Sequence, residues 1–135
     1  MPNASIIGWG KCLPPAVLSN DDLATFLETS DEWVTSRTGI RERRISHVLL
    51  GELSWVAAAR ALACAGLEGS AIDLIVFGTT THDDQCPNMA SGLQRRIGAE
   101  GCAAMDLNTA GTSFLYGLSA ATAMIRSGSV RRALV

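Results

Sequence analysis

The sequence contains few charged residues and few histidines. Each of these shortages argues against one kind of function. Only 18% of the 135 residues are charged, and the net charge is −2. The chain therefore lacks the basic surface that nucleic-acid-binding domains present. Its two histidines, His47 and His82, lie beside no serine or cysteine in a nucleophile motif. We expect both to be loop residues without a catalytic role.

The cysteines lack the spacing of a metal site or of a disulfide framework. None of them belongs to a C-x-x-C pair, and none has a histidine at ligand spacing. We therefore expect reduced thiols, no metal and no cofactor. The four residues concerned are Cys12, Cys64, Cys86 and Cys102.

Two features bear on membranes and targeting. The opening residues, MPNASIIGWG, lack a basic segment followed by a long apolar one, so we expect a cytoplasmic protein without a signal peptide. The uncharged run from Leu107 to Ile125 is long enough to span a bilayer. Six of its side chains are amides or hydroxyls, which favours a helix buried in protein rather than in lipid: Asn108, Thr109, Thr112, Ser113, Ser119 and Thr122.

The segment GWGK, residues 8–11, resembles a phosphate-binding loop only superficially. A P-loop needs four residues between its glycines, and a dinucleotide fingerprint needs a third glycine where Leu13 stands. We do not expect nucleotide phosphate binding there.

Apolar periodicity and capping residues predict alternating strands and helices. This alternation is typical of an α/β fold with a largely parallel sheet and right-handed crossovers, and no linker or repeat divides it. The expected strands are 4–10, 72–80, 102–108 and 129–135, and the expected helices are 19–27, 29–39, 51–66, 86–98 and 111–126. The last helix carries no charge before Arg126, so it needs cover on every side from further layers or another chain.

Trp33 and Arg37 lie four residues apart on the expected helix 29–39 and therefore share a face. An indole beside guanidinium groups can hold an aromatic base and its phosphates. Three further arginines follow, namely Arg41, Arg43 and Arg44. Spacing alone leaves open a buried tryptophan next to a solvated basic loop.

Four segments together resemble β-ketoacyl-acyl carrier protein synthase III of the thiolase superfamily. They are SDEWVTSRTGIRERRIS, IDLIVFGTTT, CPNMASGLQRRIG and DLNTAGTSFLYGLSAA, in that order. The resemblance implies a thiolase-like layered αβαβα fold, of which residues 1–135 would be the N-terminal half, with a mostly parallel sheet and a buried central helix. It also implies a homodimeric condensing enzyme of fatty-acid synthesis. Such an enzyme joins an acyl group from acyl-coenzyme A to malonyl-acyl carrier protein and needs no cofactor besides the coenzyme A thioester.

The resemblance assigns roles to individual positions. Thr29, Trp33 and Arg37 match residues that hold the adenine end of coenzyme A. Cys86 matches a position where many relatives have a phenylalanine that crosses the dimer interface and closes the acyl tunnel. A small interface residue without consequence is the other reading of Cys86.

Gly111 occupies the position of the family's nucleophilic cysteine, so the chain should form no acyl-enzyme. Thr112 and Ser113 point in other directions on a helix, which favours capping over replacement of the nucleophile. The family's catalytic histidine and asparagine lie in the C-terminal half, so the chain should be inactive alone. A deliberate substitution, a non-catalytic homologue and a sequence error all remain open as sources of Gly111. A structural or decoy subunit paired with an active partner is the alternative function.

Overall fold

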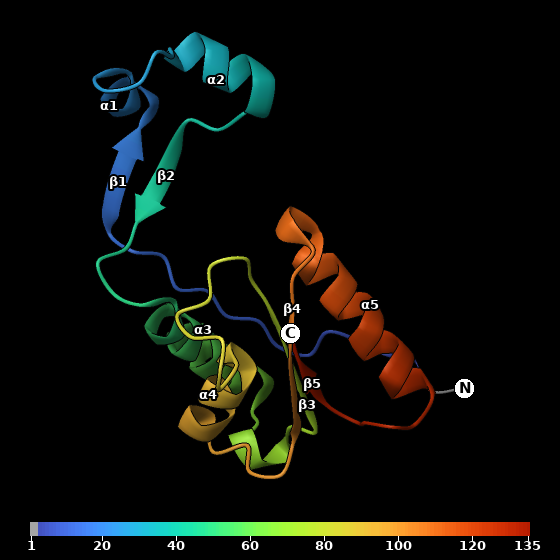
Figure 1. Ribbon diagram of the computed structural model, residues 1–135. Coiled ribbons are helices and arrows are strands. Elements are labelled where there is room, and N and C mark those ends of the chain that lie inside the picture. Colours follow the sequence, from blue (N-terminus) through green and yellow to red (C-terminus); the bar gives the residue numbers. More distant parts are fainter. Residues whose placement is uncertain (1–2) are drawn as a thin grey trace. The chain divides into compact units, whose positions relative to one another are not determined.

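A computed structural model describes residues 3–135 and divides the chain into two compact units (Figure 1). One unit comprises the residues up to Cys12 together with Leu49–Val135, and the other is Leu13–Val48. Each is described by itself, as unit 1 and unit 2.

Unit 2 consists of a two-stranded antiparallel sheet and two short helices. Strand β1 (Ala16–Ser19) pairs with β2 (Glu42–Ile45), and the helices α1 (Asn20–Ala24) and α2 (Asp31–Thr38) lie between them in sequence. The sequence did not predict either strand. The reason is local: β1 follows the LPP segment, and β2 contains three charged residues, so neither shows the apolar alternation of a strand.

Both helices of unit 2 begin at a serine cap, and α2 agrees with the helix expected at 29–39, whereas α1 is shorter than the helix expected at 19–27. Ser19 caps α1 in a reciprocal capping box with Asp22. The Ser30 hydroxyl accepts from the Trp33 amide at the start of α2. Gly39 ends α2 with a left-handed backbone, φ 73°, a conformation that glycine adopts without steric cost.

Unit 1 is built on a three-stranded parallel sheet in the order β4-β3-β5. Its strands are β3 (Leu74–Gly78), β4 (Ala103–Leu107) and β5 (Ala133–Leu134). Leu74, Ile75 and Val76 of the central strand are almost fully buried, as predicted for a strand covered on both faces.

Helices cover both faces of this sheet (Figure 1). The helices α3 (Leu50–Ala65) and α4 (Met89–Ile97) pack with Ile75 on one face. Helix α5 (Ser113–Arg126) packs through Ala121 on the other, against Leu74 and Val76. Alternate residues of β3 therefore belong to two separate cores, as the pleat of a strand requires.

Only one face of α5 is covered within the described residues. Gly117 and Ala121 are buried, whereas Phe114, Leu115 and Tyr116 are 57%, 64% and 59% exposed. The helix is therefore not buried on every side in residues 3–135. Packing on the sheet therefore accounts for the apolar residues on one face of α5 and not for those on its exposed face.

The strand predicted at 4–10 is not formed. These residues have no regular secondary structure and pair with no strand among those described. Gly8 and Gly10 lie so close to α3 that a Cβ on either would meet helix backbone, at Ala61 and Ala57 respectively. The glycines of GWGK thus allow close packing on a helix.

Among residues 3–135, no helix is both long and apolar enough to cross a bilayer.

Candidate functional site

The corner between β4 and α5 is a short 3₁₀ turn, Ala110–Thr112, with Gly111 at its centre. Ala110 has a left-handed backbone, φ 53°, which is uncommon for a residue with a side chain. Gly111 is outside that region, and a Cβ built on it would meet nothing within 4 Å. The backbone at position 111 can therefore accept a side chain, and that side chain would stand in open space.

The two hydroxyls that follow Gly111 are engaged in the turn itself. The Thr112 Oγ1 donates to the Thr109 carbonyl over 2.7 Å, and the Ser113 Oγ donates to the Ala110 carbonyl over 2.8 Å. Ser113 also accepts from the Thr109 amide at 3.0 Å. The expected capping of the helix is not observed, because Thr112 precedes α5 without a side-chain cap hydrogen bond and both hydroxyls bond backbone groups of the turn instead. No base lies beside either oxygen among the described hydrogen bonds.

Asp106, four residues before the turn, fixes the start of α4. Its carboxylate accepts from the Met89 amide at 2.9 Å and from the Ala90 amide at 2.8 Å. His82 lies beside it, with Nε2 3.4 Å from Asp106 Oδ2, and both side chains are largely buried. From the sequence we expected His82 to be a loop residue, and this contact with Asp106 was not foreseen. In the sequence, the feature that could have indicated this contact is that Asp106 lies in the strand leading to the corner.

Cys86 lies in the loop between β3 and α4, and its side chain is exposed. Asp83 anchors this loop by accepting from the Leu50 and Gly51 amides at the start of α3, at 3.1 and 2.7 Å. Cys86 itself makes no hydrogen bond among those described. Pro87 precedes the α4 cap, Asn88, and so lies just outside the helix.

Trp33 and Arg37 share one face of α2 in unit 2, as their spacing predicts. The Arg37 guanidinium lies over the indole, 5.8 Å from the ring centroid, and Trp33 is 57% exposed. The alternative of a buried tryptophan is therefore wrong. Thr29 precedes the helix cap, and its Oγ1 is buried without a hydrogen-bond partner among residues 3–135.

Two of the three arginines beyond α2 are already engaged. Arg43 donates to Asn20 Oδ1 at 2.9 Å. Arg44 pairs with Glu42 at 3.3 Å and reaches the Pro14 carbonyl at 3.5 Å. Of the three predicted cations, only Arg41 makes no described hydrogen bond.

Asn20 is a buried polar residue whose partners could not be expected from the sequence. It is 1% exposed, and its amide nitrogen donates to Asp31 Oδ1 at 2.7 Å and to the Ile40 carbonyl at 2.8 Å. The hydrogen bond from Asn20, followed by that from Thr35, lowers the pKa of Asp31. Asn20 thus joins the first turn of α2 to the segment that follows its C-terminus.

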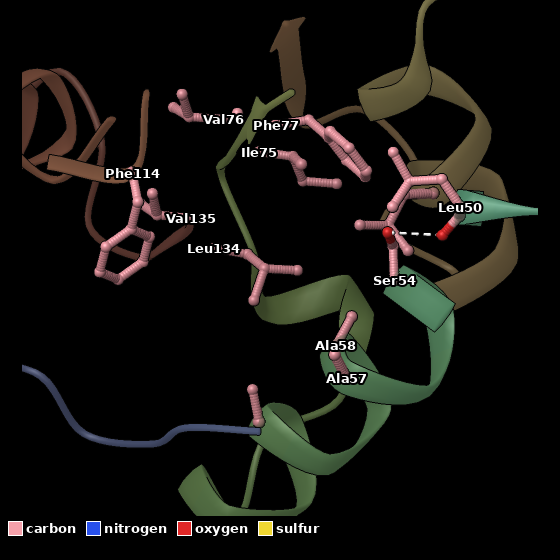
Figure 2. A pocket seen from close by; sticks show the side chains of 13 residues that line it. Leu50, Ser54, Ala57, Ala58, Ile75, Val76, Phe77, Phe114, Leu134 and Val135 are labelled. Atoms are coloured by element: carbon pink, nitrogen blue, oxygen red, sulfur yellow. Dashed lines mark hydrogen bonds between the residues drawn. The ribbon is translucent and has the colours of Figure 1, made fainter. Parts of the chain in front are cut away.

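Unit 1 also contains an apolar pocket of about 270 Å³ between its helices and strands (Figure 2). Its one side-chain hydroxyl, that of Ser54, donates to the Leu50 carbonyl at 2.8 Å. The pocket can hold an apolar group but offers no acid, base or free nucleophile. Its lining comprises Leu50, Ser54, Ala57, Ala58, Ala61, Ile75, Val76, Phe77, Gly78, Leu93, Phe114, Leu134 and Val135.

Metal binding has no support in the described residues, where no three His, Cys, Asp or Glu side chains gather.

Comparison with known proteins finds similarity to one group of enzymes. The family model 3-oxoacyl-[acyl-carrier-protein (ACP)] synthase III matches residues 105–135, which include the corner. The β-ketoacyl-[acyl-carrier-protein] synthase III 2 of Vibrio vulnificus strain YJ016 is 57% identical over 132 residues, covering 98% of this chain and 36% of that protein. The chain is similar over nearly its whole length to part of β-ketoacyl-acyl carrier protein synthase III.

Solved structures of such synthases agree with this result. The enzyme from Aquifex aeolicus superposes with a TM-score of 0.89 at 40% identity, covering 95% of this chain and 42% of that one. The enzyme from Pseudomonas aeruginosa gives 0.86 at 44% identity, covering 98% and 41%. The predicted resemblance and the thiolase-like layered α/β fold are thereby confirmed. The chain spans about two fifths of the length of the synthase III relatives it matches.

Proposed function

We propose that this chain is part of a β-ketoacyl-acyl carrier protein synthase III type condensing enzyme, altered at its nucleophile position. The reaction joins an acyl group from acyl-coenzyme A to malonyl-acyl carrier protein, with loss of carbon dioxide, and starts a fatty acid. The observation that supports this most is the corner at Gly111, which has open space for a side chain just before a helix begins.

A thiol at that corner would suit acyl transfer. Amide groups at a helix N-terminus favour a thiolate and so lower the pKa of a cysteine there. The thiolate would attack the thioester carbonyl, and the coenzyme A thiol would leave. Glycine has no side chain, so neither bond can form at position 111. Thr112 and Ser113 are engaged in the turn and do not offer a substitute.

Helix α2 supports binding of the nucleotide end of the donor. Trp33 presents an exposed indole with Arg37 over it, which suits stacking on adenine and attraction of phosphate. The buried, unpartnered hydroxyl of Thr29 is a group that a polar ligand would satisfy. We therefore assign Thr29, Trp33 and Arg37 to the coenzyme A site.

The same proposal covers partners. The family resemblance implies that the protein forms a homodimer, reacts with acyl carrier protein and is located in the cytoplasm. Within a dimer, Cys86 would contribute to the far wall of the partner's acyl tunnel, where a thiol leaves more room than a phenyl ring.

A non-catalytic subunit that pairs with an active partner is the second candidate, and Gly111 is the observation that favours it. The two candidates differ in what happens when a thiol is supplied. A condensing enzyme that lacks only its nucleophile would form an acyl-enzyme through the supplied thiol, whereas a non-catalytic subunit would not.

The test uses a chimera in which this chain replaces the matching residues of the Vibrio vulnificus synthase, its 57% identical relative. We expect the chimera with Gly111 to gain no mass after incubation with acyl-coenzyme A, because it has no nucleophile. The Gly111→Cys chimera should gain one acyl group, measured by intact-protein mass spectrometry, and should form β-ketoacyl product with malonyl-acyl carrier protein.

Gly111→Ser is the matched control, since it adds a side chain of similar size without a thiol. A stable acyl mass on Thr112 or Ser113 of the Gly111 protein would contradict the assignment of the corner. A Gly111→Cys chimera that folds but takes up no acyl group would favour the non-catalytic subunit.

A further inference from the structure

We infer that Ser113 is a positioning residue that sets the backbone of the corner and thereby the direction of any side chain at position 111. This inference rests on the proposed function, because the corner matters only if residue 111 carries chemistry. Ser113 itself would touch no substrate.

The Ser113 hydroxyl bridges two backbone groups of the turn. It accepts from the Thr109 amide at 3.0 Å and donates to the Ala110 carbonyl at 2.8 Å. These two groups flank the left-handed backbone of Ala110. A strained conformation of this kind persists where the surroundings hold it. The bridge is the shorter of the described contacts here, since the Ala110 amide also donates to Asn108 Oδ1 over 3.4 Å.

Ser113 is in turn held against the sheet. It is 4% exposed, and a Cβ built on Gly78 would lie 2.8 Å from the Ser113 Cβ. The absence of a side chain at Gly78 is therefore what lets Ser113 approach the end of β3. The turn, the first residue of α5 and the end of the central strand are therefore in close contact at this point.

Thr112 provides a contrast within the same turn. It is exposed, and its hydroxyl donates to the Thr109 carbonyl, which also accepts from the Thr112 amide. Removing that hydroxyl leaves a backbone bond in place, whereas removing the Ser113 hydroxyl leaves both of its partners without this contact.

The experiment measures the reactivity of a thiol introduced at position 111. In the 135-residue chain carrying Gly111→Cys, peptide-resolved alkylation by iodoacetamide across pH gives the pKa of that thiol. Adding Ser113→Ala should raise this pKa by about one unit and slow alkylation at pH 7 about tenfold, because the turn amides lose their orientation. Adding Thr112→Val should change the rate by less than about twofold.

A second measurement needs no thiol. In the chain with Gly111, Ser113→Ala should speed hydrogen exchange of the Thr109 amide by about tenfold, while amides of β3 keep their protection. Gly78→Ala displaces Ser113 without removing its hydroxyl, so it should shift the thiol pKa in the same direction if the first variant fails to fold.

The outcomes separate the inference from the proposed function. Alkylation requires no acyl donor, so failure of the chimera to load an acyl group leaves this test intact. An unchanged pH profile in a folded Ser113→Ala chain would overturn the inference. Unfolding of both the Ser113→Ala and the Gly78→Ala chains would also overturn it, because Ser113 would then support the whole sheet rather than the corner.

Discussion

At the level of single residues, two tryptophans make similar contacts in different surroundings. Trp55 lies beneath the Arg96 guanidinium, 4.6 Å from the ring centroid, and Arg96 is held by Glu52 through two bonds of 2.6 and 2.9 Å. Arg37 lies over Trp33 but forms no ion pair among the described residues. The charge of Arg96 is therefore satisfied internally, whereas that of Arg37 remains available to a ligand.

This difference gives a prediction for Trp33→Ala in the Gly111→Cys chimera. Acyl-coenzyme A binding should weaken by about 1 to 2 kcal/mol, because stacking on the adenine is lost. Reaction with an acyl carrier protein donor, which has no adenine, should change little. Trp55→Ala is the matched control and should leave the affinity for both donors unchanged. Equal losses with both donors for Trp33→Ala would mean that Trp33 acts through packing.

Cys86 gives a second residue-scale prediction, which concerns the length of the acyl group. If position 86 closes the tunnel, a thiol in place of a phenyl ring leaves room for several methylenes, each contributing about 0.8 kcal/mol when buried. The Gly111→Cys chimera should therefore prefer medium-chain donors, and Cys86→Phe should shift the preference toward acetyl. The measurement is kcat/KM from acetyl to dodecanoyl. If Cys86→Phe leaves the dependence of kcat/KM on chain length unchanged, Cys86 does not determine which acyl group is preferred.

At the level of elements, a single carboxylate connects the start of β3 to the start of β5. Asp73 Oδ2 accepts from the Arg131 amide at 2.8 Å and from the Arg132 amide at 2.9 Å. These bonds, with a smaller contribution from the charges of the two arginines, lower the pKa of Asp73 below its ordinary value of 3.8. The side chain thus holds a strand of only two residues in register.

The lowered pKa predicts how stability depends on pH. The stabilisation by Asp73 should be fully present above the unfolded-state pKa, near 3.8, and should be lost as pH falls through the lower folded-state value. At pH 7, Asp73→Asn should cost about 1 kcal/mol of unfolding free energy, a value reduced because the site is partly exposed. The measurement is denaturant unfolding at pH 7 and at pH 3, where the difference from the parent should shrink.

Asp84→Asn is the control for loss of charge alone, since Asp84 is exposed and makes no hydrogen bond among those described. Equal destabilisation by both substitutions, or a difference that persists at pH 3, would show that Asp73 does not act through its charge.

At the level of the whole molecule, residues 3–135 form two compact units, and unit 1 leaves an apolar surface exposed within this range. Phe114, Leu115 and Tyr116 are more than half exposed at the start of α5. The family's histidine and asparagine for condensation have no counterpart assigned within these residues. We therefore expect condensation only in the chimera, where the remainder of the synthase is supplied, even when a thiol at position 111 can be alkylated in the chain itself.

The sequence predicted most elements of unit 1, because its helices and buried strands have strong local signals. Gly66 and Gly98, for example, end α3 and α4 at the boundaries expected for helices 51–66 and 86–98. Trp33 and Arg37 were predicted to share a face because helical spacing alone determines that. The assignment of Gly111 to the nucleophile position comes from the resemblance and stays a prediction.

Other features depended on tertiary structure, because they join residues distant in sequence. The strands of the β1–β2 pair show no apolar periodicity in the sequence. The partners of the buried Asn20 are brought together only when the chain folds. The strand predicted at 4–10 was wrong for the same reason, since an apolar run becomes a strand only where a neighbouring strand offers backbone hydrogen-bond partners. Ser113 could be expected to cap a turn from sequence, but its hold on Ala110 and its contact with Gly78 exist only because β3 and α5 meet there.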